Sequence, residues 1–316
     1  MTSALEVLAT GPLVLVEDDG RPGLAAIGVG RSGAADRTAY RLGARLVGNG
    51  DGRAALEVLL GGLSVRARGR VTVALTGAPA PAVVDGRPVG HATVVDVPDG
   101  SVLTLGVPAT SLRTYLTVRG GIDVAPVLGS RSTDTLSGLG PAPVRVGDVL
   151  PIGMPGSDFP TVDQVALPDT RGVGPVLLEV LPGPRAAWVG GVDRVGRVGG
   201  VGGSADDLGG LLGATWVVAG DSDRVGIRLT GSRVRRAPEW EGTELPSEGL
   251  VRGAVQVPAG GEPVAFLADH PVTGGYPVVA VLTASAADRA AQLRPGDAVR
   301  LARAGTRRGS ARAIAR

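Results

Sequence analysis

Polar residues gather near the C-terminal end of the chain, on both sides of a short hairpin pattern. Ser247 and Glu248 precede the hairpin, Asp269 and His270 follow it, and Thr273-Gly274-Gly275-Tyr276 comes next. A glycine pair lets the backbone approach another group closely, and the flanking Thr and Tyr add two hydroxyl groups. Such a loop is suited to holding a small polar ligand, and a tight structural turn explains it as well.

Two apolar runs with strand character form the hairpin itself, Ala254–Val257 and Val264–Leu267. The segment Pro-Ala-Gly-Gly-Glu-Pro joins them, and this composition is typical of a turn. The sequence therefore predicts two paired strands, with the polar residues before and after them.

A second set of polar residues flanks a predicted helix in the first quarter of the chain. Asp36 can cap the segment Arg37–Val47, which ends at Gly48. Ser32, Asp36 and Asn49 could contribute to a polar site. The pattern also fits Asp36 as a helix cap and Asn49 as a turn residue.

From Ala55 to Val118, short apolar runs with strand character follow one another at close spacing. Asp85-Gly86 and Asp99-Gly100 are typical of hairpin turns between such strands. Glu57 interrupts one of the apolar runs, so it either faces solvent or is held in a site. The pattern predicts an antiparallel β barrel or sandwich with little room for crossover helices.

Two further loops combine acidic and basic side chains. In the loop Gly129–Asp134, Ser132 and Asp134 lie beside an arginine, which suits a cradle for an anion or carboxylate and equally a turn that caps itself. In the second half of the chain, Asp223 and Arg224 are adjacent and could pair with each other.

The composition excludes several kinds of chemistry. The chain has no cysteine and all 32 basic residues are arginine, so it supplies no disulfide, thiolate nucleophile, P-loop lysine or Schiff-base lysine. His91 and His270 share no recognisable metal-ligand spacing with carboxylates, so we expect no structural metal. The N-terminus lacks the basic segment of a signal peptide, and no apolar stretch is long enough to cross a membrane. We therefore expect a cytoplasmic protein.

A similar four-residue segment occurs at the end of each half of the chain, Gly147-Asp148-Val149-Leu150 and Gly296-Asp297-Ala298-Val299. This similarity suggests a duplicated unit. Pro155–Pro175 is rich in proline and glycine and is the candidate boundary. The final residues carry five arginines and no acid, without interleaved aromatic residues, so we expect a solvated tail and no nucleic-acid partner. The predicted division is two domains at 1–165 and 172–302 and a disordered tail at 303–316.

Several of these stretches together resemble one protein family. Ser247–Pro258 (SEGLVRGAVQVP) and Asp269–Pro277 (DHPVTGGYP) are similar to signature segments of the family formed by the C subunits of bacterial 5-oxoprolinases. This family is also called the KipA or allophanate hydrolase subunit 2 family, and it is related to the carboxyltransferase part of biotin-dependent urea carboxylase. Gly129–Gly140 and Asp221–Gly231 match as well, so the resemblance covers nearly all of the chain.

The resemblance implies a mainly β fold of two packed cyclophilin-like β barrels with a few short helices. It also implies a subunit of a bacterial ATP-dependent 5-oxoprolinase, which hydrolyses 5-oxo-L-proline to L-glutamate together with a KipI-like and a LamB-like subunit. We expect this chain to be inactive alone and ATP to be used by the assembled complex.

The resemblance further directs attention to a cleft shared by the two halves. Asp36 and Glu248 are the acid–base candidates there. The expected substrate-binding residues are Arg21, Ser32, Asn49, Ser132, Asp134, Ser247, Gln256, Thr273, Gly274, Gly275 and Tyr276.

Two other functions stay open. The chain could be a carboxyltransferase that receives CO2 from biotin, which a partner would have to carry because this chain has no lysine to biotinylate. It could also be a KipA-like regulatory protein that binds a kinase inhibitor without turnover.

Overall fold

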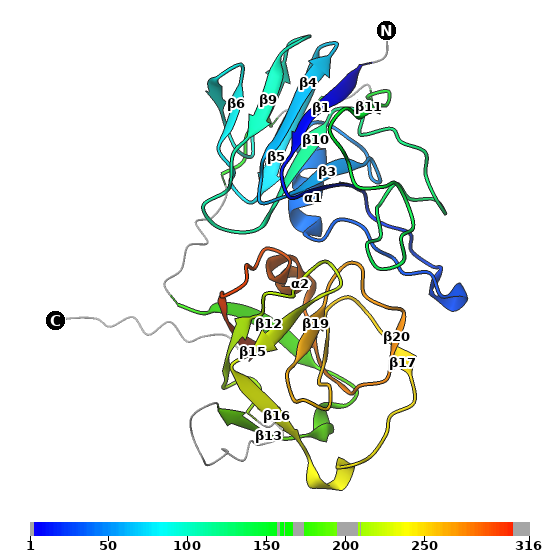
Figure 1. Cartoon of the computed structure of the whole chain (residues 1–316), viewed down its shortest axis with the longest axis vertical. Coiled ribbons are helices and arrows are strands. Elements are labelled where there is room, and N and C mark those ends of the chain that lie inside the picture. The colour runs from blue at the N-terminus through cyan, green and yellow to red at the C-terminus, as the bar shows by residue number, and fades with distance from the viewer. Residues whose placement is uncertain are drawn as a thin grey trace, which may run out of the picture.

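A computed structural model describes residues 3–156, 159–160, 162–166, 174–194, 208 and 210–305. The chain forms two halves, which follow each other along the long axis in Figure 1. Within the described residues, strands dominate and only two α-helices occur, so the prediction of a mainly β fold is confirmed. Most of the predicted tail lies outside the described residues. No described helix has the length and apolar character needed to span a membrane.

The N-terminal half consists of two antiparallel sheets that enclose one apolar core. Its strands are β1 (Ala4–Thr10), β2 (Leu13–Glu17), β3 (Ala55–Leu59), β4 (Leu63–Arg68), β5 (Val71–Gly77), β6 (Ala82–Val84), β7 (Arg87–Val89), β8 (Val94–Val97), β9 (Val102–Leu105), β10 (Arg113–Val118) and β11 (Val149–Pro151). The first sheet has the order β11-β1-β4-β9-β6-β7, and the second has the order β2-β3-β10-β5-β8. Leu5 and Val65 from the first sheet pack with Val16 and Leu56 from the second.

Helix α1 (Arg37–Leu46) covers the outer face of the second sheet, against β5 and β10. It begins where the sequence predicts, because the Asp36 carboxylate accepts a hydrogen bond from Ala39 N. Gly43 allows the close approach: a Cβ atom there would lie 2.4 Å from Thr117 Oγ1. The first turn of the helix lies at the edge of the sheet that faces the C-terminal half.

The C-terminal half is a closed barrel. Its elements are β12 (Val176–Pro182), β13 (Val189–Arg194), β14 (Thr215–Val218), β15 (Gly226–Thr230), β16 (Ser232–Arg236), β17 (Glu248–Gly249), β18 (Ala254–Gln256), β19 (Val264–Phe266), β20 (Thr273–Gly274), β21 (Val278–Leu282), β22 (Ala298–Arg303) and α2 (Ala284–Ala290). The barrel order is β12-β21-β18-β19-β15-β14-β22, while β13-β16 and β17-β20 form two-stranded sheets beside it. Trp216 and Leu229 lie in the barrel core.

Two of the three predicted hairpins are confirmed, and one is wrong. The central hairpin is confirmed, since Val255 of β18 pairs with Ala265 of β19. The Asp85-Gly86 turn joins β6 and β7, and both of its residues have positive φ angles of 48° and 77°. The hairpin predicted at Asp99-Gly100 is wrong, because β8 pairs with β5 and β9 pairs with β4 and β6. That segment passes between sheets instead.

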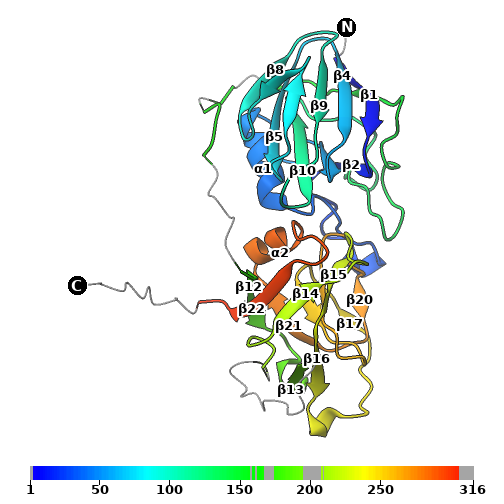
Figure 2. The same cartoon turned by 60° about the vertical axis from the view of Figure 1, so that its left-hand side comes forward.

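Side chains of the C-terminal half hold backbone groups of the N-terminal half along the seam where the halves meet. Helix α2, which lies next to this seam in Figure 2, supplies Asp288; its carboxylate accepts hydrogen bonds from Arg37 N and Thr38 N at the start of α1. Gln292 Oε1 accepts from Arg113 N at 2.8 Å. Helix α2 is capped by Thr283, because Thr283 Oγ1 accepts from Ala286 N.

Candidate functional site

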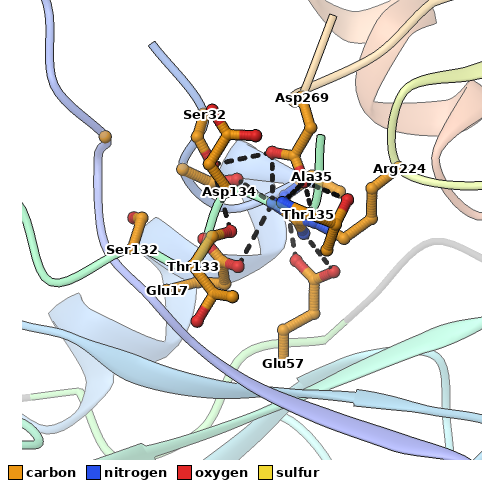
Figure 3. Close-up of polar contacts among 12 residues, drawn as sticks. Glu17, Ser32, Ala35, Glu57, Ser132, Thr133, Asp134, Thr135, Arg224 and Asp269 are labelled. Carbon is orange, nitrogen blue, oxygen red and sulfur yellow. Dashed lines mark hydrogen bonds and ion pairs between the residues drawn. The ribbon is translucent and has the colours of Figure 1, made fainter. Parts of the chain in front are cut away.

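An ion cluster is buried in the seam between the two halves. Arg224, which is only 3% exposed, comes from the loop between β14 and β15 and is enclosed by Glu17 of β2, Glu57 of β3 and Asp269 after β19. Arg224 Nε donates to Asp269 Oδ2 at 2.8 Å and Arg224 Nη1 donates to Glu57 Oε1 at 2.5 Å, as Figure 3 shows. Arg224 Nη2 lies 3.2 Å from Glu17 Oε1. The cluster thus joins three acids from both halves through one arginine.

The carboxylates of this cluster also hold the surrounding loops. Asp269 Oδ1 accepts a hydrogen bond from Ser32 Oγ at 2.7 Å, and Asp269 Oδ2 accepts one from Thr135 Oγ1 at 2.7 Å. Glu57 Oε2 accepts from Tyr115 Oη at 2.7 Å and from Ala35 N at 2.9 Å. Glu57 is therefore held in a site, which is one of the two alternatives that the sequence left open.

The pair suggested between the neighbours Asp223 and Arg224 is wrong. The Asp223 carboxylate instead accepts hydrogen bonds from Val225 N at 2.8 Å and Gly226 N at 3.2 Å, so it caps its own turn. This turn points Arg224 into the seam, where three acids from other elements surround it.

Burial decides the charge state of the cluster. Desolvation raises the pKa of Glu17 well above its ordinary value, and its carboxyl oxygens have no hydrogen-bond partner within the described part of the chain. Burial opposes ionisation of Glu57 and Asp269 too, but the Arg224 guanidinium outweighs it and lowers the pKa of both acids. With Arg113 also bound to Glu57, two cations face the two carboxylates whose pKa is lowered.

A cavity of about 380 Å³ lies beneath the loop that the sequence marked as chemically interesting. It is lined by Arg228, Gln256, Phe266, Gly274 and Tyr276, among others. Gln256 is buried, and its Nε2 donates to the carbonyl oxygen of Tyr276 at 2.8 Å. A Cβ atom on Gly274 would lie 2.8 Å from Gln256 Nε2, so a larger residue there would require the Gln256 side chain to shift. We call this space the loop cavity.

A larger groove of about 950 Å³ adjoins the loop cavity at Gly275 and Tyr276. Arg233, Arg235 and Arg236 of β16 line it. We call it the arginine groove. Its rim is supported by stacked Trp188 and Trp240 rings, whose centroids are 4.7 Å apart, and Arg236 lies over Trp188 at 5.1 Å. Glu241 and Glu244 line the groove as well, so three arginines and two acids border a cavity with a buried carboxamide.

Glu248 pairs with Arg185, and neither of these residues lines the loop cavity or the arginine groove. Its strand β17 pairs with β20, so Glu248 lies opposite Gly274. The hydrogen bond from Arg185 lowers the pKa of Glu248, which keeps this carboxylate ionised at neutral pH. The strand pairing thus connects the backbone of Glu248 to Gly274, which lines the loop cavity.

The structure brings the predicted C-terminal residues together and separates the N-terminal ones from them. Glu248, Gln256 and Thr273–Tyr276 belong to the same paired segments around the loop cavity, and Ser247 Oγ lies near the position that a Gly275 Cβ would take. Asn49 lies elsewhere, because it donates to Val118 O and accepts from Gly120 N in a turn beyond the end of α1.

The other predicted N-terminal residues have partners within the fold. Arg21 donates to the carbonyl oxygens of Val127 and Ser132, and Ser132 Oγ donates to Asp18. Asp134 accepts from backbone N–H groups at the start of its own turn, as the self-capping alternative predicted. Ser32 bonds directly to the ion cluster, through Asp269. Substrate-binding roles for this group stay predictions.

Asp36 is both the cap of α1 and a perturbed acid. The residue is 9% exposed, with Oδ1 occupied by Ala39 N and Oδ2 by Gln292 Nε2 at 2.9 Å. Desolvation raises its pKa from 3.8 to about 6. An acid–base role for Asp36 stays a prediction, whereas its capping role is visible.

The sequence analysis did not predict that Arg224 and Glu17 belong to one cluster. It also did not single out the arginines of β16, which line the arginine groove. The available signal was an acid at the end or in the middle of an apolar strand, at Glu17 and Glu57, which requires a cation when the strand is buried. Within the part of the chain that the structure describes, no three His, Asp or Glu side chains converge as metal ligands.

Comparisons with known proteins show which proteins this chain is similar to. Residues 27–303 match the family model described as carboxyltransferase domain, subdomain A and B. The chain is 35% identical over 285 residues to the C subunit of Escherichia coli 5-oxoprolinase, a match that covers 88% of this chain and 84% of that protein. It is 32% identical over 316 residues to urea amidolyase of Saccharomyces cerevisiae, but this match covers 94% of this chain and only 16% of that protein.

Solved structures that superimpose on this chain agree with these sequence matches. The crystal structure of TTHA0988 superimposes with a TM-score of 0.78 at 32% identity, covering 95% of this chain and 55% of that chain. The K. lactis urea amidolyase structure gives a TM-score of 0.80 at 28% identity and covers 94% of this chain but 18% of that one. The chain therefore spans about half or less of the solved chains it matches.

The two-part β fold and its family match define a carboxyltransferase-domain protein. Within that class, the chain belongs to the family of 5-oxoprolinase C subunits, since it is similar to a named member along most of both sequences.

Proposed function

We propose that this chain is the C subunit of an ATP-dependent 5-oxoprolinase that opens 5-oxo-L-proline to L-glutamate. The observation that carries this proposal is the match to the E. coli C subunit over 84% of that protein, against 16% of the yeast urea amidolyase. We further propose that the chain works in the cytoplasm with a KipI-like and a LamB-like subunit and is inactive without them.

The reaction requires activation of an amide. Water adds its oxygen to the lactam carbonyl carbon, the ring C–N bond breaks, and the nitrogen leaves as the amine of glutamate. Transfer of the ATP γ-phosphoryl group to the lactam oxygen would leave ADP and make the carbon more electrophilic. After water attacks, the ring nitrogen would take up a proton as the C–N bond breaks, and the phosphoryl group would leave as inorganic phosphate. Such a step needs donors for the developing negative charge and cations for the phosphoryl oxygens.

The chain offers both kinds of group on one surface. The buried Gln256 carboxamide and the backbone around Gly274 line the loop cavity, which suits a small cyclic amide. Arg233, Arg235 and Arg236 line the adjoining groove and suit the oxygens of a carboxylate or a phosphoryl group. We propose that substrate occupies the loop cavity and that its anionic groups face the arginine groove.

We propose Glu248 as the acid–base residue in preference to Asp36. Glu248 lies in β17 opposite Gly274 and is partly accessible, whereas both carboxyl oxygens of Asp36 hold parts of the fold. Because Arg185 keeps Glu248 ionised, this carboxylate would accept a proton or orient the attacking water.

The test is glutamate formation from 5-oxoproline and ATP by this chain together with the KipI-like and LamB-like subunits of its source, with each component omitted in turn. We expect activity only with all subunits present. Full activity without this chain would overturn the proposal. Tight association without turnover would favour the KipA-like regulatory function.

A second candidate is carboxyl transfer from biotin, which the urea amidolyase match over 94% of this chain favours. The biotin would be carried by a partner, since this chain has no lysine. Formation of a carboxylated amide from a biotinylated carrier charged with bicarbonate, and dependent on this chain, would support it. Glutamate formation in the absence of any biotinylated protein would exclude it.

A further inference from the structure

A third cavity, of about 480 Å³, lies in the seam on the side of β2 and β3. We call it the seam cavity. Six leucines of the N-terminal half line it, together with Val225 and Pro295 of the C-terminal half. Small-molecule sites in proteins commonly have volumes of about 300 to 1,000 Å³ and apolar walls with a few polar groups. The seam cavity has this character; it shares no lining residue with the arginine groove, and it meets the loop cavity at Asp223 and Val225.

The floor of the seam cavity is polar and belongs to the ion cluster. Glu57, Arg113 and Arg224 line it. Arg113 is 4% exposed; its Nε donates to Glu57 Oε1 at 3.2 Å and its Nη1 donates to the carbonyl oxygen of Ala291. Among the described residues, Arg113 Nη2 has no hydrogen-bond partner, whereas all three nitrogens of the Arg224 guanidinium are occupied. One donor of this nearly buried side chain is therefore available to a ligand in the cavity.

The charges around this donor favour an uncharged ligand. Arg113 and Arg224 are balanced by Glu57 and Asp269, and Asp223 also lines the cavity, so the floor has no excess cation to compensate a bound anion. Moving a carboxylate from water into such a place costs several kcal/mol without a dedicated counter-ion, roughly the penalty that buried ions pay in proteins. A neutral carbonyl oxygen accepts the same hydrogen bond without that cost.

We propose that the seam cavity is a second binding site, for an uncharged carbonyl compound with a compact apolar body, whose oxygen accepts a hydrogen bond from Arg113 Nη2. Cycloalkyl amides and ketones belong to this class. 5-Oxoproline does not, because it carries a carboxylate. Since residues of both halves line the cavity, a bound ligand stabilises the contact between the halves and raises the temperature of unfolding by mass action.

The experiment uses the full chain and three probes with the same ring: cyclohexanecarboxamide, cyclohexanecarboxylate and cyclohexylmethylammonium. Calorimetry and thermal unfolding report binding to each. We expect the amide to bind and to raise Tm, with the carboxylate at least about tenfold weaker, a difference of about 1.4 kcal/mol. The ammonium probe has no acceptor for the Arg113 donor, so it should not bind measurably. Equal binding of either charged probe, or no binding of the amide, would overturn the proposal.

A matched pair of variants locates the site. Leu136 lines the seam cavity and Leu181 on β12 does not, yet both are 52% exposed, so tryptophan is tolerated at either position. Leu136→Trp partly fills the cavity, and we expect it to weaken amide binding at least about tenfold. Leu181→Trp should leave binding unchanged. Equal affinities in the two variants would place the amide elsewhere and overturn the proposal. Because no 5-oxoproline, ATP or partner is present, the outcome is independent of the proposed catalytic function.

Discussion

Arg224 of the C-terminal half donates from Nη1 to Glu57 Oε1 of the N-terminal half at 2.5 Å, across 167 positions of sequence. Both side chains are buried, and Arg224 is also the cation that compensates Asp269 and faces Glu17. The contact between the two halves therefore depends strongly on one guanidinium group.

Replacement of this arginine should destabilise the protein strongly. Arg224→Met leaves Glu57 and Asp269 buried without their main cation, and the loss of one partner of a buried ion pair costs about 3 to 5 kcal/mol. Urea denaturation followed by circular dichroism measures this loss. Arg228→Met is the matched control, because the Arg228–Asp221 pair is exposed and exposed pairs contribute up to about 1 kcal/mol. Similar losses in both variants would contradict a special role for Arg224.

Glu17 should make stability depend on pH. Burial raises its pKa in the folded state above the ordinary 4.5, so the folded state binds this proton more tightly than the unfolded state. Its contribution to the free energy of unfolding is then present below pH 4.5 and is lost as pH rises above that value. We expect Glu17→Gln to raise Tm relative to the natural protein at pH 8 and to leave it nearly unchanged at pH 4. A Tm difference independent of pH would refute this account.

Asp36→Asn separates the capping role of this residue from an acid–base role. Asparagine also caps helices, so α1 should remain intact. The folded pKa of about 6 lies above the ordinary 3.8, so stability from this group is lost as pH rises from 3.8 to about 6. The loss amounts to roughly 3 kcal/mol.

The variant should therefore flatten the pH profile of the unfolding free energy in this window. Glutamate formation by the reconstituted complex should stay within about threefold, a barrier change under about 0.7 kcal/mol. A loss of activity with an unchanged fold would identify Asp36 as the acid–base residue after all.

The glycine pair of the loop cavity provides a test of the site with its own control. Gly274→Ala places a Cβ atom 2.8 Å from Gln256 Nε2 and 3.0 Å from Leu250 Cδ1, so Gln256 must move. A Cβ atom on Gly275 has its nearest neighbour at 3.6 Å, which is an ordinary contact. We expect Gly274→Ala to lower kcat/KM for 5-oxoproline about a hundredfold, since small misplacements in a site cost this much. Gly275→Ala should retain most activity, and the reverse order would reject the loop cavity as the substrate site.

Glu248→Gln tests the proposed acid–base residue. Removal of a general acid or base lowers the rate about 10² to 10⁴-fold. Glu248 and Arg185 are partly exposed, so the fold should tolerate the change, and a thermal melt serves as the control. Activity close to that of the natural complex would show that Glu248 only orients Arg185.

Local features of this protein follow directly from short stretches of sequence. Asp36 caps α1 because its carboxylate reaches an N–H group three residues away, and Asp85-Gly86 forms a hairpin because both residues accept positive φ. The strands Ala254–Gln256 and Val264–Phe266 pair because their turn is short. The family resemblance is equally a property of the sequence, and the match over residues 27–303 confirms it.

Contacts over long sequence distances were decided by the tertiary structure alone. Arg224 stands next to Asp223 in the sequence, yet it pairs with Glu57 and Asp269, because the seam offers buried carboxylates that need a cation. The tertiary structure also separates Asn49 from the loop cavity. Asn49 follows the C-terminal end of α1, and the helix holds it apart from the residues at its N-terminal end. Residue types indicate which groups can ionise or donate, but the pairing and charge state of each group depend on which elements the fold buries against one another.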